Sequence, residues 1–79
     1  MAAPPKKCAN ENDKCTCDGT VYYGKRFASG KPGKGDEINF DELKAGPHKV
    51  KEGVTGTIKC SNGVFGDPVP GFYKQCFCA

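Results

Sequence analysis

The sequence predicts a small disulfide-rich domain, mainly β with one short helix (α+β), built around a compact antiparallel sheet. Three observations lead to this fold class. The chain has only 79 residues, so it can bury little apolar core and needs covalent cross-links. It carries six cysteines, and an even number in a short chain is typical of a disulfide framework. Its 11 glycines and 6 prolines, with 37 % hydrophobic residues, favour short strands and turns over a helical bundle.

The cysteines mark the extent of the domain. They are Cys8, Cys15, Cys17, Cys60, Cys76 and Cys78, and four of them form two Cys-x-Cys pairs near the two ends. Alternate residues of a strand point to the same face, so each pair is expected to project both sulfurs to one side. We expect all six to be bonded, but the spacing does not choose among the pairings. Residues 1–7 are expected to be a flexible segment and residues 8–79 a single domain.

The first half of the chain contains one strand signal and one helix signal. A strand is expected over Thr16–Tyr23, where Thr, Val and Tyr favour β structure. The Gly-rich stretch Ser29–Gly35 has the composition of a mobile loop. Asn39 is expected to cap a short helix over residues 40–45, with Glu42 reaching back to the cap.

The second half contains strand and turn signals only. The alternation in Val54–Cys60 predicts a strand, and Asn62-Gly63 after it predicts a tight hairpin. Asp67-Pro68 and Pro70-Gly71 then predict two turns in close succession. Gln75–Cys78 is expected to close the domain as its last strand.

Cysteine usage and the first residues indicate an oxidising compartment. The start Ala-Ala-Pro-Pro, at residues 2–5, is typical of a mature end left by signal cleavage, with Met1 added for expression. We therefore expect a secreted, extracellular protein, and a monomer. No apolar run is long enough to span a bilayer. The net charge of +3 comes from cations spread among nine acids, which does not predict nucleic-acid binding.

Catalytic and metal signals are weak. Cys-x-Cys pairs can ligate zinc, but structural zinc sites usually have wider spacings, and His48 is the single histidine of the chain. No nucleophile lies beside a base, and oxidised cysteines offer no thiolate. The sequence therefore predicts no enzyme activity, no metal and no cofactor.

Ligand binding has a stronger signal, because aromatic and basic residues recur in two stretches. Rigid rings beside charged groups are suited to sugars, since rings stack on C–H faces while charged groups hold hydroxyls. The alternative is that the rings simply form the small core. The set comprises Tyr22, Tyr23, Lys25, Arg26, Phe27, Phe72, Tyr73 and Lys74.

Two short motifs resemble those of rhamnose/galactose-binding lectin domains of the sea-urchin-egg-lectin type. Tyr23-Gly24-Lys25 is similar to the Tyr-Gly-Arg motif of that family, with Lys for Arg. The stretch 66–74 is similar to its Gly-Asp-Pro-Cys-Pro-Gly-x-Tyr-Lys motif, with Val69 in place of the cysteine. The resemblance implies sugar-site roles for Tyr23, Asp67 and Lys74, which Asn62, just upstream of the second motif, could join. Lys25, at the Arg position of the first motif, is the fifth candidate ligand-binding residue. It covers about a dozen residues, and the missing cysteine implies a different disulfide plan.

The cysteine layout also resembles that of small secreted cysteine-rich proteins of filamentous fungi. Many of these are candidate effectors, which act in virulence by binding rather than by catalysis. We therefore expect a secreted, non-enzymatic, effector-like protein that binds a host protein or a cell-wall glycan. A lectin-like carbohydrate-binding module is the alternative. An antifungal or antimicrobial protein is the second, although no basic amphipathic stretch supports it.

Overall fold

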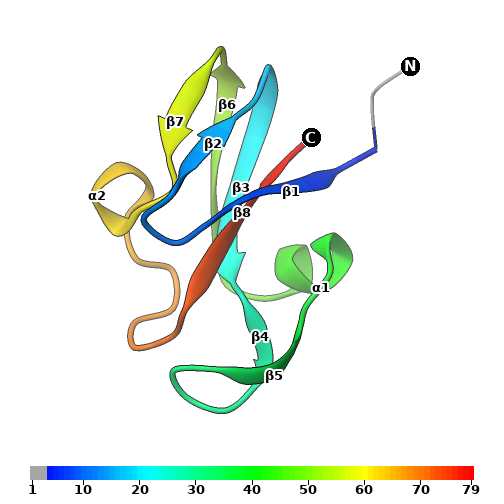
Figure 1. Ribbon diagram of the computed structural model, residues 1–79, viewed down its shortest axis with the longest axis vertical. Coiled ribbons are helices and arrows are strands. Elements are labelled where there is room, and N and C mark those ends of the chain that lie inside the picture. The colour runs from blue at the N-terminus through cyan, green and yellow to red at the C-terminus, as the bar shows by residue number, and fades with distance from the viewer. Residues whose placement is uncertain (1–3) are drawn as a thin grey trace.

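Residues 4–79 are described by a computed structural model (Figure 1). A four-stranded antiparallel sheet has the strand order β1-β8-β3-β6, and two small sheets pair β2 with β7 and β4 with β5. The strands are β1 (Lys6–Asn10), β2 (Lys14–Thr16), β3 (Gly19–Lys25), β4 (Phe27–Ser29), β5 (Lys34–Glu37), β6 (His48–Val54), β7 (Thr57–Lys59) and β8 (Lys74–Cys78). The helices are α1 (Phe40–Ala45) and α2 (Asn62–Phe65). The mainly β, disulfide-rich fold class is confirmed, with a second short helix.

Strand β8 lies at the centre of the main sheet, between β1 and β3. Four of its five residues are buried, which confirms the closing strand expected at the end of the domain. Both of its neighbours come from the first third of the chain. The main sheet therefore joins the two ends of the sequence through backbone hydrogen bonds as well as through cysteines (Figure 1).

Strand β1 starts inside the segment that was expected to be flexible. Lys6 pairs with Cys78 and Lys7 with Phe77 in the register of β1 and β8. The Lys7 side chain also forms an ion pair with Glu37, which accepts a second bond from Arg26 at 2.9 Å. The hydrogen bond from Lys7, and secondarily that from Arg26, lower the pKa of the Glu37 carboxyl. Residues 1–3 of the expected flexible segment lie outside the described residues.

Three disulfides link all six cysteines: Cys8–Cys15, Cys17–Cys78 and Cys60–Cys76. The second joins the turn before β3 to the end of β8, and the third joins the end of β7 to β8. The prediction that every cysteine is bonded is thus confirmed. Cys15, Cys60 and Cys76 are fully buried, so the cross-links also supply core volume that the short chain lacks.

Helix α1 forms where the sequence predicts it. The Asn39 side chain accepts a bond from the Glu42 amide at 2.9 Å, and the Glu42 carboxylate accepts one from the Asn39 amide at 3.0 Å. This is the reciprocal cap expected from the sequence. The helix buries Leu43 directly over Gly24 of β3, where a Cβ would lie 2.8 Å from the leucine Cγ. The glycine of the Tyr-Gly-Lys motif is therefore required for close packing of the helix on the sheet.

Three local predictions differ from the structure. The strand expected over residues 54–60 is interrupted, because β6 ends at Val54 and β7 begins at Thr57; Gly56 between them has φ of 84°, outside the range of a strand. The hairpin expected at Asn62-Gly63 is instead the first half of α2. The strand expected over residues 16–23 is divided between β2 and β3, with a turn at Cys17-Asp18.

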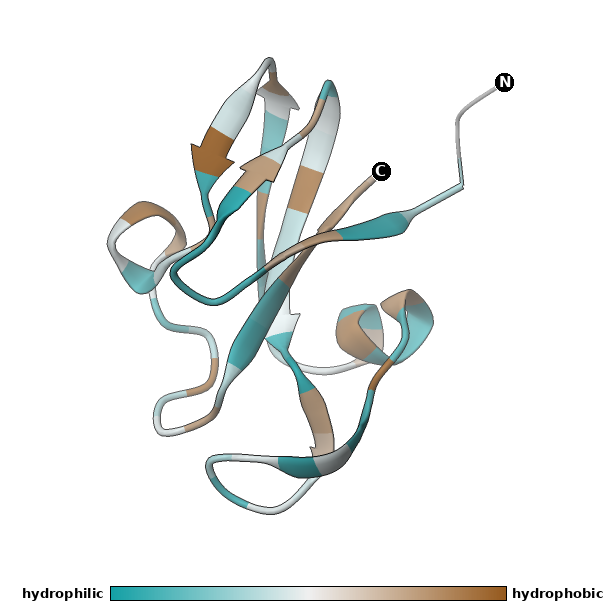
Figure 2. Ribbon diagram, viewed as in Figure 1, coloured by the Kyte–Doolittle hydropathy of each residue, from teal (hydrophilic) through white to brown (hydrophobic). Residues whose placement is uncertain are grey.

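The core lies between the main sheet and the β2–β7 pair. It consists of Ala9, Cys15, Cys17, Val21, Tyr23, Cys60, Phe65 and Cys76. Figure 2 shows that hydrophobic stretches are short and scattered over β2, β3, β4, β7, the end of β8 and the two helices, while β5 and most of β6 are hydrophilic. Half of the core residues are cysteines, so the fold depends on its disulfides for packing as well as for chain closure.

Candidate functional site

The loop between α2 and β8 carries the second lectin-like motif, and its conformation is fixed by local bonds. The Asp67 carboxylate accepts a bond from the Val69 amide at 3.3 Å, which forms an Asx turn. The Phe72 amide bonds the Val69 carbonyl at 3.2 Å, and Gly71 adopts φ of 85°. The predicted succession of turns therefore presents Asp67 in a fixed frame.

Lys74, the last residue of the motif, has a buried ammonium group. Its side chain is only 3 % exposed. The Nζ donates to the Phe72 carbonyl at 2.8 Å and lies 3.1 Å from Asp67 Oδ1 and 3.7 Å from Glu11 Oε2. The other Glu11 oxygen accepts from the Lys74 amide at 3.1 Å. One cation is thus held between two carboxylates, as a buried charge requires.

Tyr23 lies next to this ion cluster, fully buried in β3. Its hydroxyl donates to the Asn62 side chain at 2.6 Å, and its ring stacks on Phe65 at 5.0 Å between centroids. Burial raises the pKa of the Tyr23 phenol far above its usual value, and the carboxylates of Glu11 and Asp67 raise it further. The phenol is therefore a permanent hydrogen-bond donor at any ordinary pH.

The structure brings together four of the five residues that were expected to bind a ligand: Tyr23, Asn62, Asp67 and Lys74. We call these four residues with Glu11 the Asp67 cluster. Glu11 was missed, because it stands in a polar stretch with no motif around it. The carboxylates remain partly exposed, at 21 % for Glu11 and 34 % for Asp67. The cluster can therefore offer carboxylate oxygens to hydroxyl groups of a ligand.

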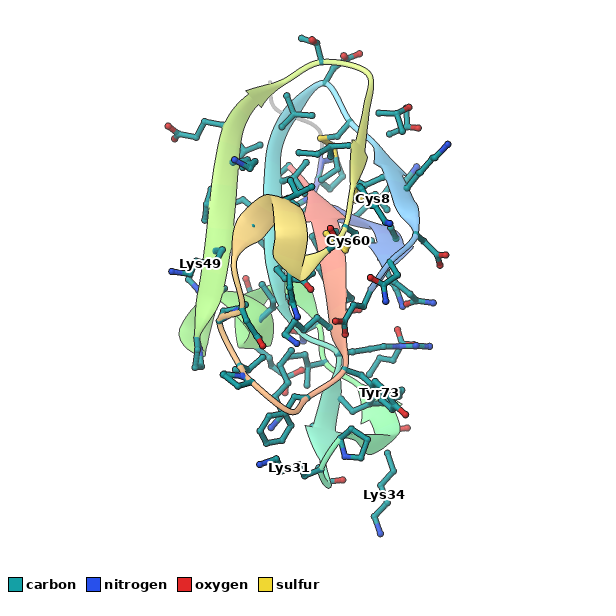
Figure 3. All side chains as sticks on the ribbon, turned by 90° about the vertical axis from the view of Figure 1, so that its left-hand side faces the viewer. Cys8, Lys31, Lys34, Lys49, Cys60 and Tyr73 are labelled. Atoms are coloured by element: carbon teal, nitrogen blue, oxygen red, sulfur yellow. A yellow bond between two sulfur atoms is a disulfide. The ribbon has the colours of Figure 1, made fainter. Side chains whose placement is uncertain are left out.

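The fifth residue, Lys25, lies beside a different ring. Its Nζ is 4.7 Å from the centre of the Phe72 ring, and the Nζ of Lys31 is 5.5 Å from the same centre. Phe27 packs edge-on against Tyr73 at 6.3 Å between centroids. We give the name Phe72 surface to the set Lys25, Phe27, Lys31, Phe72 and Tyr73. Figure 3 shows Lys31, Lys34 and Tyr73 gathered at one end of the molecule.

The remaining members of the aromatic and basic set lie elsewhere. Tyr22 is on the opposite face of the main sheet, where its ring packs edge-on against Phe40 at 4.9 Å. Arg26 bonds Glu37 and covers the Phe27 ring. The alternative interpretation, that the rings form the core, is therefore correct for Tyr23. Tyr22 is half-buried outside that core, and Tyr73 is 49 % exposed.

A groove of about 640 Å³ lies away from both sets of residues. Its lining includes Lys6, Lys14 and the Cys17–Cys78 disulfide. A smaller cavity of about 270 Å³ lies between Phe27, Leu43 and Pro47. Across residues 4–79, no three His, Cys, Asp or Glu side chains are grouped closely enough to hold a metal ion.

The Tyr23 phenol makes stability pH-dependent. In the unfolded state the Tyr23 phenol loses its proton at about pH 10, whereas in the folded state it keeps the proton to a higher pH. Above about pH 10 the unfolded state therefore binds fewer protons than the folded state, and the free energy of unfolding falls as pH rises. Tyr23→Phe removes this pH dependence, and it also removes the hydrogen bond to Asn62, which is worth about 1 kcal/mol. We expect the free energy of unfolding of the wild type, relative to that of Tyr23→Phe, to fall by about 1.4 kcal/mol between neutral pH and about pH 11. Denaturant unfolding of both proteins from neutral to alkaline pH measures it; parallel curves would contradict the assignment.

A scan against protein-family models, and searches of curated proteins and of solved structures, find no match for this chain. Neither helix within residues 4–79 has the length and apolar character needed to cross a membrane. Function therefore has to be argued from the two sets of residues described above.

Proposed function

We propose that this protein is a secreted, non-enzymatic binding protein of the fungal-effector type, and that its ligand is a cell-wall carbohydrate. Three disulfides in so short a chain are consistent with an extracellular location, where such bonds persist. Binding a glycan outside the producing cell combines the effector-like expectation with the lectin-like one. It needs neither a cofactor nor a reactive side chain.

One observation carries the proposal: the convergence of the Asp67 cluster. Asp67 and Lys74 come from the late motif, while Tyr23 comes from the early one, 44 residues upstream of Asp67. Their contacts are specific, with the Tyr23 hydroxyl fixing Asn62 and the Lys74 ammonium fixing Asp67. Fixed carboxylates that are still partly exposed are pre-organised acceptors, so little ordering is needed when a hydroxyl binds.

Asp67→Asn is the decisive variant. The amide keeps an oxygen for the Val69 amide, so the turn is retained, but the acceptor loses its charge. We expect affinity for a neutral sugar to fall about tenfold or more, because hydrogen bonds to charged groups are worth about 1.5–3 kcal/mol. The measurement is an NMR titration with rhamnose, galactose and short neutral cell-wall oligosaccharides. Shifts should centre on Asn62, Asp67 and Lys74.

The matched control is Asp41→Asn, which removes the same charge from the exposed first turn of α1. It should bind sugar as the wild type does. Equal losses in both variants would indicate a general charge effect and contradict the site. No shifts in the wild type at millimolar neutral sugar would remove neutral carbohydrates as ligands of the Asp67 cluster. Pull-down of host proteins would then test whether the ligand is a host protein.

A further inference from the structure

The Phe72 surface contains two cations directed at one ring. Lys25 reaches the Phe72 ring from the end of β3, and Lys31 reaches it from the β4–β5 turn. Because both ammonium groups lie within 5.5 Å of one centroid, they are at most about 10 Å apart. Within residues 4–79, neither has a carboxylate within ion-pair distance. Like charges repel at this range, so an anion between or beside them is favoured.

Lys31 is positioned by the backbone of the motif loop. A Cβ at Gly71 would lie 2.7 Å from Lys31 Cε and 3.3 Å from its Nζ, so the lysine stem lies directly on the glycine. The turn itself is fixed to the loop, since the Tyr73 amide bonds the Pro32 carbonyl at 2.9 Å. Lys31 is exposed, and its side chain lies along the glycine with the ammonium beside the Phe72 ring.

Tyr73 completes this surface with an exposed ring. It and Val50 are the large hydrophobic residues that are exposed among the described residues, and Val50 belongs to β6, outside this surface. Tyr73 follows Phe72 in the chain and packs edge-on against Phe27. Its exposed ring can stack on one face of a sugar unit, while the lysines beside Phe72 hold the acidic group of that unit or of a neighbouring one. It offers too little exposed apolar area for insertion into a membrane.

We propose that the Phe72 surface binds the uronic acid units of an acidic polysaccharide, with Lys25 and Lys31 contacting sugar carboxylates and Tyr73 stacking on a sugar ring. This inference rests on the proposed carbohydrate-binding function and adds a charged subsite to it. The Phe72 surface adjoins the Asp67 cluster, because the Phe72 carbonyl accepts a bond from the buried Lys74 ammonium. A nucleic acid is less favoured, since its phosphates require a track of cations and this surface is compact.

The test compares an oligomer of uronic acid with the same oligomer after its carboxyl groups have been reduced to alcohols. Binding is followed by calorimetry and by NMR shifts of Phe72 and Tyr73. The double variant Lys25→Gln/Lys31→Gln should bind the acidic oligomer about tenfold or more weakly, as loss of two charge-assisted contacts implies. Its dependence on salt should also be weaker. Tyr73→Ala should weaken binding without changing that dependence.

Lys44→Gln is the matched control, because Lys44 lies 4.8 Å from the Phe40 ring centre and also lacks a carboxylate partner among the described residues. It should bind the acidic oligomer like the wild type. Equal loss in this control, equal binding of the reduced oligomer, or preference for single-stranded DNA or vesicles of anionic lipid would overturn the inference.

The outcomes also separate this inference from the proposed function. If neutral sugars perturb Asp67 but the acidic oligomer leaves Phe72 unchanged, the charged subsite is wrong and the proposed function stands. If the acidic oligomer binds at Phe72 while no neutral sugar perturbs Asp67, the charged subsite stands and the Asp67 cluster is only structural. Binding of neither sugar would contradict both.

Discussion

Replacing Cys17 and Cys78 together by alanine should lower the free energy of unfolding by about 4 kcal/mol, the largest effect of any change considered for this chain. The two residues are 61 positions apart. A cross-link across so long a loop removes much of the conformational freedom of the unfolded chain, which stabilises the folded state by comparison. A domain of this size has a total stability of only about 4–12 kcal/mol, so the variant should lose at least about a third of its stability and should unfold at a clearly lower denaturant concentration.

Removal of the Cys8–Cys15 bridge provides the control, because these residues are only 7 positions apart. The same argument gives a cost of about 2.4 kcal/mol for this bridge. Both double-alanine variants are compared with the wild type by denaturant unfolding, monitored by circular dichroism. A larger loss for the short bridge would contradict the loop-closure explanation and show that packing of the sulfurs decides the cost.

The sequence was sufficient where a local signal and the tertiary contacts agree. The helix α1 carries its own cap in Asn39 and Glu42, and Leu43 then packs on Gly24. The place of β8 as the closing strand follows from Cys76 and Cys78, which are bonded to Cys60 and Cys17. In each case the residues that define the element are also those that fix it in the fold.

It was insufficient where a tertiary partner selects the local conformation. Asn62-Gly63 favours a hairpin turn by composition. In α2, however, Asn62 and Phe65 are three residues apart on a helical turn, so both face Tyr23, one bonding its hydroxyl and the other stacking on its ring. These contacts with a residue of β3 override the local preference. No pattern in residues 62–65 alone indicates them.

Strand β6 was missed because its residues carry no strand signal of their own. It is an edge strand that pairs only with β3, and five of its seven residues are exposed. Such a strand lacks the apolar alternation that marks a half-buried one, and its lysines are typical of edges protected from pairing with other chains. Glu11 was missed because its partner, Lys74, is distant in the sequence, and no motif around Glu11 indicates the contact.

Lys74→Met should destabilise the protein by about 3 kcal/mol. Methionine matches the length of the lysine stem and fills its space, so the loss reports the ammonium group. Without it, the Phe72 carbonyl loses its donor and the carboxylates of Glu11 and Asp67 face each other unneutralised. Because both carboxylates are partly exposed, water relieves some of the penalty, which places the effect at the lower end for a broken buried pair.

Lys25→Met is the matched control, since Lys25 lies opposite Lys74 in the register of β3 and β8 but has no carboxylate partner among the described residues. It should cost about 1 kcal/mol or less, the value of its contact with the Phe72 ring.

Denaturant unfolding of Lys74→Met, Asp67→Asn and the double variant then forms a cycle. The loss of unfolding free energy in the double variant should be smaller than the sum of the two single losses, by about 1 kcal/mol or more. The reason is that the Asp67 carboxylate no longer neutralises a cation once Lys74 has been replaced by methionine. Strict additivity would mean that the two groups do not interact energetically, and the exposed carboxylate would then be available to a ligand without any loss of stability.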